Sequence, residues 1–126
     1  MTDKPIKVFI AVGSNIDPEI NILQALKRIK EPVKITGIST FYQTPPIERP
    51  VQQPFLNGVW RIETLMSART LKFNCLRTIE NELGRVRTED KYAARTIDLD
   101  IIIYGDMVID EPDLQIPDPD IYTRSF

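Results

Sequence analysis

The stretch ARTIDLDIIIYG, residues 94–105, places two aspartates inside a segment that is otherwise apolar and β-branched. The segment is short and ends at a Tyr-Gly-Asp turn signal, which predicts a β-strand. Successive side chains of a strand point to opposite faces, so Asp98 and Asp100 share one face. Because burial of two unpaired charges is costly, this face must pair with cations, hold metal or open to water.

The segments before this strand predict an α+β fold. A nearly continuous apolar run at 8–13 is typical of a central strand, and Asp17 and Pro18 indicate the start of a helix. Ser67 is a suitable N-cap for a second helix. Strands are therefore expected at 8–13, at 33–43 with a bulge at Gly37, at 55–64 and at 97–103, with helices from Asp17 to about Lys30 and from Ser67 to about Leu83.

The order β-α-β-β-α-β predicts a ferredoxin-like sandwich, in which both helices cover one face of a mainly antiparallel sheet. The other face of the sheet is then left available for a site. The apolar stripe of the second helix includes Leu76, Ile79 and Leu83, so Glu80 is expected to fall outside it.

Length and composition indicate one domain over 1–126, because 126 residues with 42% hydrophobic side chains suit a single core. The 16 basic and 18 acidic residues give a net charge of -2, which offers no general attraction for nucleic acid or an anionic membrane. The N-terminal MTDKPIK lacks the apolar core of a signal peptide, and no apolar run approaches membrane-spanning length. We therefore expect a cytoplasmic protein.

Two residue types limit the chemistry. The chain has no histidine, which excludes Ser-His and Cys-His catalytic pairs and the commonest zinc sites. The lone Cys75 lies four residues from Leu71 and from Ile79, so we expect a small core residue rather than a reactive thiol.

The two aspartates of the strand suit magnesium. Carboxylates at i and i+2 are about 6.5 to 7 Å apart at their Cα atoms, close enough to share two divalent ions about 4 Å apart. Oxygen ligands without histidine or cysteine favour magnesium, which takes its remaining ligands from water and phosphate, so the pair predicts a nucleotide substrate. The alternative is that Asp98 and Asp100 only pair with Arg95 or neighbouring cations on a solvated sheet face.

Basic residues gather before the strand and near the end of the chain, where they could supply the fork-shaped donors that phosphates need. Glu89 and Asp90 are interleaved with them, so a solvated charge run is the alternative. The basic residues are Arg85, Arg87, Lys91, Arg95 and Arg124.

Phe55 and Asn57 share a face of the strand at 55–64. An asparagine amide donates and accepts hydrogen bonds together, so it can recognise a flat heterocycle beside an aromatic ring. Phe126 is a second candidate aromatic, although such rings are more often part of the core.

Taken in order along the chain, these segments resemble the 6-hydroxymethyl-7,8-dihydropterin pyrophosphokinases, folate-pathway enzymes that move a diphosphate from ATP to a pterin alcohol. The most specific piece is R-T-x-D-L-D followed by a hydrophobic run. The resemblance is carried by VFIAVGSN, FYQTPP, PFLN, ENELGRVR, AARTIDLDIIIYG and IPDPDIYTRSF.

The resemblance implies that Asp98 and Asp100 hold two magnesium ions that bridge the ATP phosphates, and that Arg85 and Arg95 share the catalytic role. It implies ATP and the reduced pterin alcohol as partners, with no obligate protein partner, and loops over 44–54 and 84–95 that close over the substrates. The implied ATP contacts are Glu80, Arg87 and Arg124, and the implied pterin contacts are Thr44, Pro45, Ile47, Phe55, Asn57 and Phe126.

The chain also departs from the family pattern. Asp118 and Pro119 stand where the family typically has His-Tyr, and Tyr92-Ala93-Ala94 replaces Trp-Gly-Pro before Arg95. The sequence ends at Phe126, where family members usually continue for a few dozen residues, so a short form is expected. Two other functions stay open: another magnesium-dependent nucleotidyl or phosphoryl transferase, and a non-catalytic relative that binds pterin or nucleotide.

Overall fold

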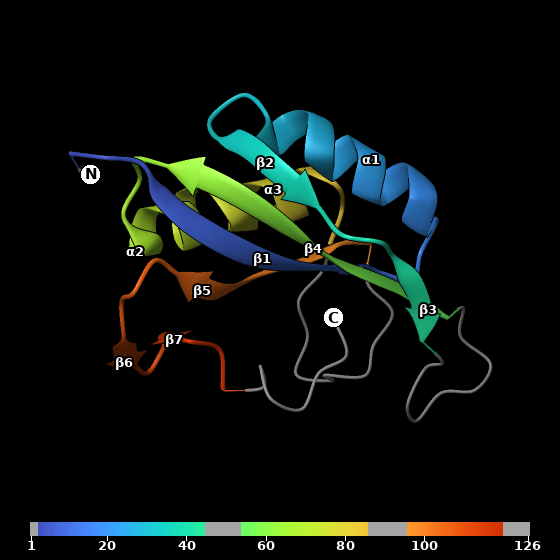
Figure 1. Ribbon diagram of the computed structural model, residues 1–126. Coiled ribbons are helices and arrows are strands. Elements are labelled where there is room, and N and C mark those ends of the chain that lie inside the picture. Colours follow the sequence, from blue (N-terminus) through green and yellow to red (C-terminus); the bar gives the residue numbers. More distant parts are fainter. Residues whose placement is uncertain (1–2, 45–53, 86–95, 120–126) are drawn as a thin grey trace.

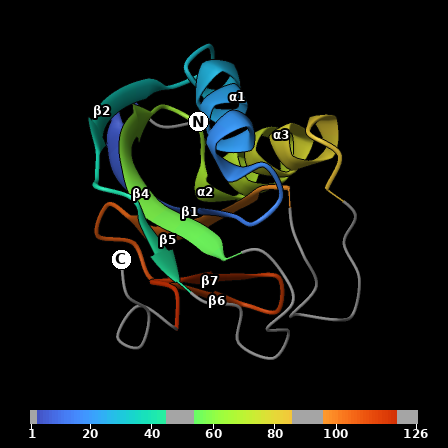
Figure 2. The same ribbon diagram turned by 90° about the vertical axis from the view of Figure 1, so that its right-hand side faces the viewer.

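The computed structural model describes residues 3–44, 54–85 and 96–119, which are drawn in colour in Figure 1. A five-stranded antiparallel sheet is covered on one side by helices, and a small hairpin lies beside it (Figures 1 and 2). In chain order the elements are β1 (Ile6–Ser14), α1 (Pro18–Ile29), β2 (Lys34–Ile38), β3 (Tyr42–Thr44), β4 (Phe55–Thr64), α2 (Ala68–Thr70), the π-helix η1 (Leu71–Leu76), α3 (Arg77–Glu82), β5 (Asp98–Tyr104), β6 (Ile109–Glu111) and β7 (Leu114–Ile116).

The four main strands lie in the order β2-β4-β1-β5, every neighbouring pair is antiparallel, and β3 extends the pairing of β4. The helices α1 and α3 lie over the same face of this sheet in both views (Figures 1 and 2). The predicted α+β class, with a mainly antiparallel sheet and its helices on one face, is therefore confirmed.

The core lies between the helices and the sheet. Alternate residues of β1 face the helices, and Val8 and Ile10 are fully buried there. Trp60 and Ile62, two residues apart in β4, supply the same face and are also buried. Helix α1 contributes Ile29, which is also fully buried, so this helix packs on the same core.

The expected strand at 33–43 forms two shorter strands. The pairing of β2 with β4 shifts between Ile35 and Gly37, which agrees with the predicted bulge. Beyond β2, Phe41 places its ring so close to Gly58 that a Cβ at Gly58 would lie 2.5 Å from it. The chain leaves the regular pairing after Ile38 and resumes it in β3 at Tyr42.

The two predicted helix starts differ in how they are capped. Ser67 caps α2 as expected, because its Oγ accepts a hydrogen bond from the Thr70 N–H at 3.2 Å. Asp17 precedes α1 but makes no capping hydrogen bond through its side chain, and its φ is 40°. The predicted helix start at Pro18 is therefore confirmed, whereas the prediction that the side chain of Asp17 caps the helix is wrong.

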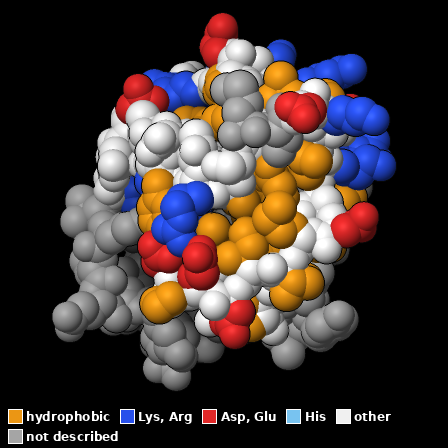
Figure 3. Space-filling view, turned by 90° about the vertical axis from the view of Figure 1, so that its left-hand side faces the viewer, with side chains coloured by type: hydrophobic (Ala, Val, Ile, Leu, Met, Phe, Trp, Pro, Cys, Tyr) orange, Lys and Arg blue, Asp and Glu red, His pale blue; other side chains and the backbone are white. Residues whose placement is uncertain are grey.

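An apolar surface lies at the end of the sheet where β1 begins and β4 ends (Figure 3). It includes a pocket of about 660 Å³ between the start of β1, the α1–β2 turn and the end of β4. Its apolar lining residues are Pro5, Pro32, Val33, Leu65 and Met66. Among the described residues, no helix is long and apolar enough to span a membrane.

Candidate active site

Asp98 and Asp100 lie on the face of β5 that points away from the helices. Asp98 pairs with Gly13 and Asp100 pairs with Ala11, in the register that joins β5 to β1. Directly paired residues share a face, and this is the face opposite the buried Val8 and Ile10. The period-two prediction that the two aspartates point the same way is confirmed.

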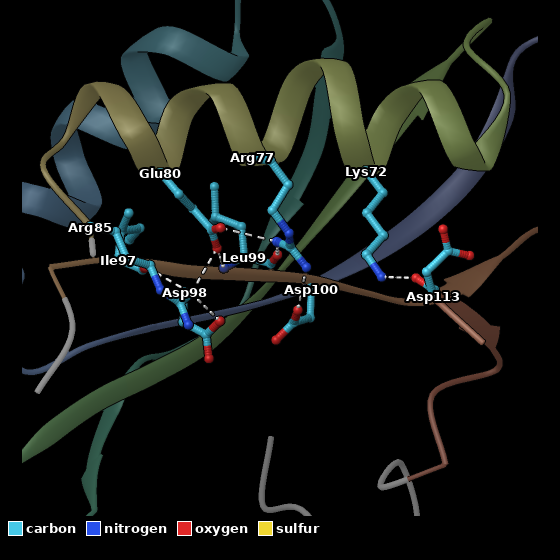
Figure 4. Close-up of polar contacts among 9 residues, drawn as sticks. All are labelled: Lys72, Arg77, Glu80, Arg85, Ile97, Asp98, Leu99, Asp100 and Asp113. Carbon is cyan, nitrogen blue, oxygen red and sulfur yellow. Dashed lines mark hydrogen bonds and ion pairs between the residues drawn. The ribbon is translucent and has the colours of Figure 1, made fainter. Parts of the chain in front are cut away.

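The outer edge of β5 is covered by side chains from the helix above it (Figure 4). The Leu99 N–H donates to Glu80 Oε2 at 2.8 Å, and the Leu99 carbonyl accepts from Arg77 Nη1 at 2.9 Å. Arg85 Nη1 donates to the Ile97 carbonyl at 3.2 Å. Polar groups on the edge of a sheet need such partners, so these side chains fix β5 against α3.

The same side chains reach the two aspartates and form a chain of alternating charges (Figure 4). Arg85 Nη1 lies 2.7 Å from Asp98 Oδ1 and 2.9 Å from Glu80 Oε2. Arg77 Nη1 lies 3.1 Å from Glu80 Oε1, and its Nη2 lies 3.4 Å from Asp100 Oδ1. Glu80 is therefore the hub that joins both arginines, and each arginine holds one aspartate.

Burial and neighbouring charges shift the pKa of Arg85 in opposite directions. Its side chain is 7% exposed. Burial disfavours its charged form, but Asp98, Glu80 and Asp100 together raise the pKa of the guanidinium above its ordinary value. Its Nε is buried and has no hydrogen-bond partner among the described residues. A phosphate oxygen or a water is the kind of acceptor that such a donor needs.

Glu80 differs from the sequence expectation. It was placed outside the apolar stripe, yet its side chain is 1% exposed and faces the edge of β5. Burial of this charge is tolerated because two arginines and a backbone N–H surround the carboxylate. A contact between Glu80 and the nucleotide stays a prediction.

A pocket of about 490 Å³ lies beside the two aspartates, between the helix, β5 and the β6–β7 hairpin. Lys72 of η1 and Arg77 of α3 line the pocket on the helix side. The other lining residues are Asp98, Asp100, Ile101, Pro112, Asp113, Leu114, Gln115, Asp118 and Pro119.

The donor set of this pocket fits magnesium. In the described ranges, no three histidine, cysteine or acidic residues cluster to form a site made by protein ligands alone. Magnesium needs only one or two carboxylates when water and phosphate supply its other ligands. Asp100, with a side chain 31% exposed in the pocket, and Asp98, at 14%, meet that requirement.

The candidate pterin residues lie on the same face of the sheet. Asn57 pairs with Gly13, which pairs in turn with Asp98, so the three residues form one row across β4, β1 and β5. Asn57 Nδ2 donates to Thr44 Oγ1 at 2.6 Å, and Thr44 pairs with Phe55. The sheet therefore brings the described pterin candidates and the aspartates onto one surface.

The remaining predicted site residues lie outside the described residues. They are Pro45, Ile47, Arg87, Arg95, Arg124 and Phe126.

Arg77 and Lys72, which line the pocket, were not among the residues predicted from the sequence. Arg77 stands three residues before Glu80, a spacing at which helical side chains meet, and this signal could have identified it. Lys72 stands five residues before Arg77 and gave no such signal, because an α-helix does not align residues five apart.

Comparison with known sequences gives a consistent match. The profile of the 7,8-dihydro-6-hydroxymethylpterin-pyrophosphokinase (HPPK) family matches residues 9–126. The chain is 38% identical to the 2-amino-4-hydroxy-6-hydroxymethyldihydropteridine pyrophosphokinase of Haemophilus influenzae, over 96% of this chain and 76% of that protein. It is 37% identical to the protein of the same name from Bacillus subtilis, over 94% of this chain and 71% of that protein.

Longer relatives contain a similar segment. The chain is 38% identical to the folic acid synthesis protein fol1 of Pneumocystis carinii, over 94% of this chain but only 16% of that protein. It thus spans most of the two bacterial proteins and a small part of fol1. The match to the family profile over nearly the whole chain and the identity to the bacterial proteins show that this chain belongs to the HPPK family.

Proposed function

We propose that this chain transfers a diphosphate from ATP to 6-hydroxymethyl-7,8-dihydropterin, giving AMP and the pterin diphosphate in folate biosynthesis. Membership of the HPPK family and the names of the bacterial relatives support this proposal. The structural observation that carries it is the position of Asp98 and Asp100 in a pocket on the sheet face that also bears Asn57.

Asp98 and Asp100 would hold magnesium between the protein and the ATP phosphates, and we propose two ions. Magnesium bound there supplies charge neutralisation and orients the phosphates for displacement. Arg85 and Arg77 orient the two carboxylates from the helix side, so the oxygens that would bind metal are positioned before it arrives.

Glu80 holds the positive charge of Arg85 in place, and the buried Nε of Arg85 is a donor with no acceptor among the described residues. We propose that this guanidinium acts on the charge that develops during diphosphate transfer, together with Arg95. Arg87 and Arg124 are proposed phosphate contacts, and Glu80 a proposed contributor to nucleotide binding. Fixed cations of this kind stabilise charge without a covalent nucleophile.

The pterin would bind over β4, where the Asn57 amide can donate and accept hydrogen bonds at the edge of a heterocycle. The hydrogen bond to Thr44 holds this amide in a defined orientation. Phe55 would lie beside the ring, and the other proposed pterin contacts are Pro45, Ile47 and Phe126. Adjacent strands are about 4.8 Å apart, so Asn57 and Asp98 are separated by roughly 10 Å, a distance suited to a hydroxymethyl group that reaches a metal-bound phosphate.

A ferredoxin-like arrangement is part of this proposal. The order β2-β4-β1-β5 with antiparallel neighbours is the order that two interleaved β-α-β units give. The short strand β3 and the β6–β7 hairpin are additions to it. A cytoplasmic location and activity without an obligate protein partner belong to the same proposal.

A non-catalytic relative is the second candidate, because Asp118 lines the pocket where the family pattern has a histidine. An added carboxylate opposes the binding of a polyphosphate unless cations balance it.

One experiment separates the candidates: the protein is incubated with ATP, magnesium and the reduced pterin alcohol, and the nucleotide and pterin products are separated by chromatography.

AMP and a pterin diphosphate in equal amounts are the expected products, and both should disappear with excess chelator. The matched control is the Asp98→Ala/Asp100→Ala variant. Pterin binding without AMP would support the non-catalytic relative, and release of ADP or pyrophosphate would support another phosphoryl or nucleotidyl transferase.

A further inference from the structure

The π-helix η1 aligns two basic side chains that an α-helix would separate. The Arg77 N–H donates to the Lys72 carbonyl, the i to i+5 hydrogen bond that defines this wider turn. In an α-helix, residues five apart lie about 140° apart around the axis, so they face different surroundings. The wider turn stacks them, and both side chains extend from the helix toward β5 and Asp113 (Figure 4).

Lys72 and Arg77 line the same pocket as Asp98 and Asp100. Of the described residues that line it, they are the two basic ones, whereas four are aspartates. A polyphosphate would meet strong repulsion from this set of carboxylates if magnesium were its only positive contact. Fixed cations on the helix side of the pocket would provide the second attraction.

Contacts with the protein hold both cations in defined positions beside the pocket. Arg77 donates to Glu80, to the Leu99 carbonyl and to Asp100, which uses three of the five guanidinium N–H groups. Lys72 Nζ donates to the Asp113 carbonyl in the turn of the hairpin, so its ammonium is held at the rim of the pocket that it lines. The carboxylate of Asp113 itself is taken by Arg69, through contacts of 2.9 and 3.0 Å.

We propose that Lys72 and Arg77 form a phosphate-binding pair for the nucleotide, placed in the pocket by the π-helical turn. This inference rests on the proposed function, because it assigns the nucleotide to the pocket beside the aspartates. The pair supplies anchored positive charge in a lining that also contains Asp118. Anchored donors bind an anion with little loss of side-chain freedom.

The competing explanation is purely structural. Arg77 covers the edge of β5 and Lys72 holds the turn of the β6–β7 hairpin, so both could serve stability alone. The two explanations differ in what their variants change. Loss of a phosphate contact weakens nucleotide binding at constant pterin affinity, whereas loss of support lowers the melting temperature and affects both ligands.

The test is isothermal titration of a non-hydrolysable ATP analogue with magnesium into Arg77→Gln, Lys72→Met and the wild-type chain. Reduced pterin alcohol is then titrated with the analogue saturating, and thermal melts are recorded without ligand. The double variant Lys72→Met/Asn74→Lys keeps the net charge of the wild type but moves the positive charge to an exposed position of the helix. It therefore shows whether binding depends on the position of this charge or only on the net charge of the protein. Lys27→Met, on the exposed side of α1, is the remote control.

We expect roughly ten- to a hundredfold weaker nucleotide binding for Arg77→Gln, and several-fold weaker binding for Lys72→Met and for the double variant. The pterin affinity and Lys27→Met should stay near wild type. Nucleotide affinity unchanged in Arg77→Gln and Lys72→Met, with normal wild-type binding, would overturn the inference and leave the proposed function standing. A wild-type chain that binds no nucleotide would overturn both.

Discussion

Asn57 and Asp98 lie in one row across the sheet, and Gly13 on β1 pairs with both of them. A Cβ on Gly13 would lie 2.9 Å from Asn57 Oδ1, so the amide occupies space that any other residue would fill. Glycine at position 13 therefore leaves room for the Asn57 amide, in the row that runs from the proposed pterin site to the proposed metal site.

Gly13→Ala should weaken pterin binding. The added methyl group would force the Asn57 side chain to rotate, which breaks its hydrogen bond to Thr44. A loss of roughly two- to tenfold in pterin affinity is expected, as for one hydrogen bond, with nucleotide affinity nearly unchanged. Titration of the reduced pterin alcohol against a saturating ATP analogue measures it.

Gly37→Ala is the matched control for this variant. The three atoms nearest to its new Cβ belong to the side chain of Arg61, at 3.2 to 3.3 Å, in the part of β2 near its bulge. Equal effects of the two alanines on pterin affinity would show that the row through Gly13 has no special role.

Asp98→Ala and Asp100→Ala should each reduce diphosphate transfer by roughly a hundredfold or more, because each removes a proposed metal ligand. The fold should persist, since both side chains lie on the open face of β5 rather than in the core. Product formation at saturating substrates and circular dichroism measure the two effects. Near-normal turnover at limiting magnesium in both variants would contradict the metal assignment.

Much of this surface could be predicted from local patterns. Period two in the strand placed Asp98 and Asp100 on one face, and the same rule placed Phe55 with Asn57. The aspartates also pair with cations, which was the stated alternative to metal binding, and their partners include Arg85 as well as Arg77. Pairing with arginine and a role in metal binding are compatible, because an arginine contact orients the carboxylate.

The network behind the aspartates could not be predicted for a physical reason. Arg77 meets Asp100 across 23 residues of sequence, a contact that only the packing of α3 on the edge of β5 creates. The π-helical turn is equally hidden, because Leu71, Cys75 and Ile79 keep the four-residue spacing typical of an ordinary helix. Burial of Glu80 follows from the same packing of α3 on β5, because its carboxylate accepts from the Leu99 N–H.

Glu80→Ala should lower the free energy of unfolding by about 3 to 5 kcal/mol, because it leaves two arginines without their buried partner and the Leu99 N–H without its acceptor. Urea unfolding without ligand measures this loss. Glu82→Ala, which removes an exposed carboxylate 3.7 Å from Arg28, should cost less than about 1 kcal/mol.

Glu80 was also predicted to contact the nucleotide, and the same variants separate the two roles. If Glu80→Ala unfolds like Glu82→Ala yet loses nucleotide binding, Glu80 acts as a ligand contact rather than as the hub of the buried network. A conservative Glu80→Gln variant should retain part of the lost stability, because its amide oxygen can still accept from Leu99.

Cys75 gives a prediction for alkaline pH. The thiol is buried, as its helical spacing predicted, and burial raises its pKa above the ordinary value. In the unfolded chain the thiol ionises near pH 8.5, whereas the folded protein retains the proton to higher pH. The folded state then binds more protons than the unfolded state, so this contribution to stability is complete below pH 8.5 and is lost as pH rises through the folded pKa.

The free energy of unfolding should therefore begin to fall above about pH 8.5, and urea titrations at half-unit steps from pH 7.5 measure the slope. Tyr104, whose pKa burial also raises, contributes at higher pH because a free tyrosine ionises near pH 10. Cys75→Ala is the control, since the cavity it creates lowers stability equally at every pH and only the loss of the thiol changes the slope. Parallel pH profiles for wild type and Cys75→Ala would show that the thiol ionises alike in both states, against the effect expected from its burial.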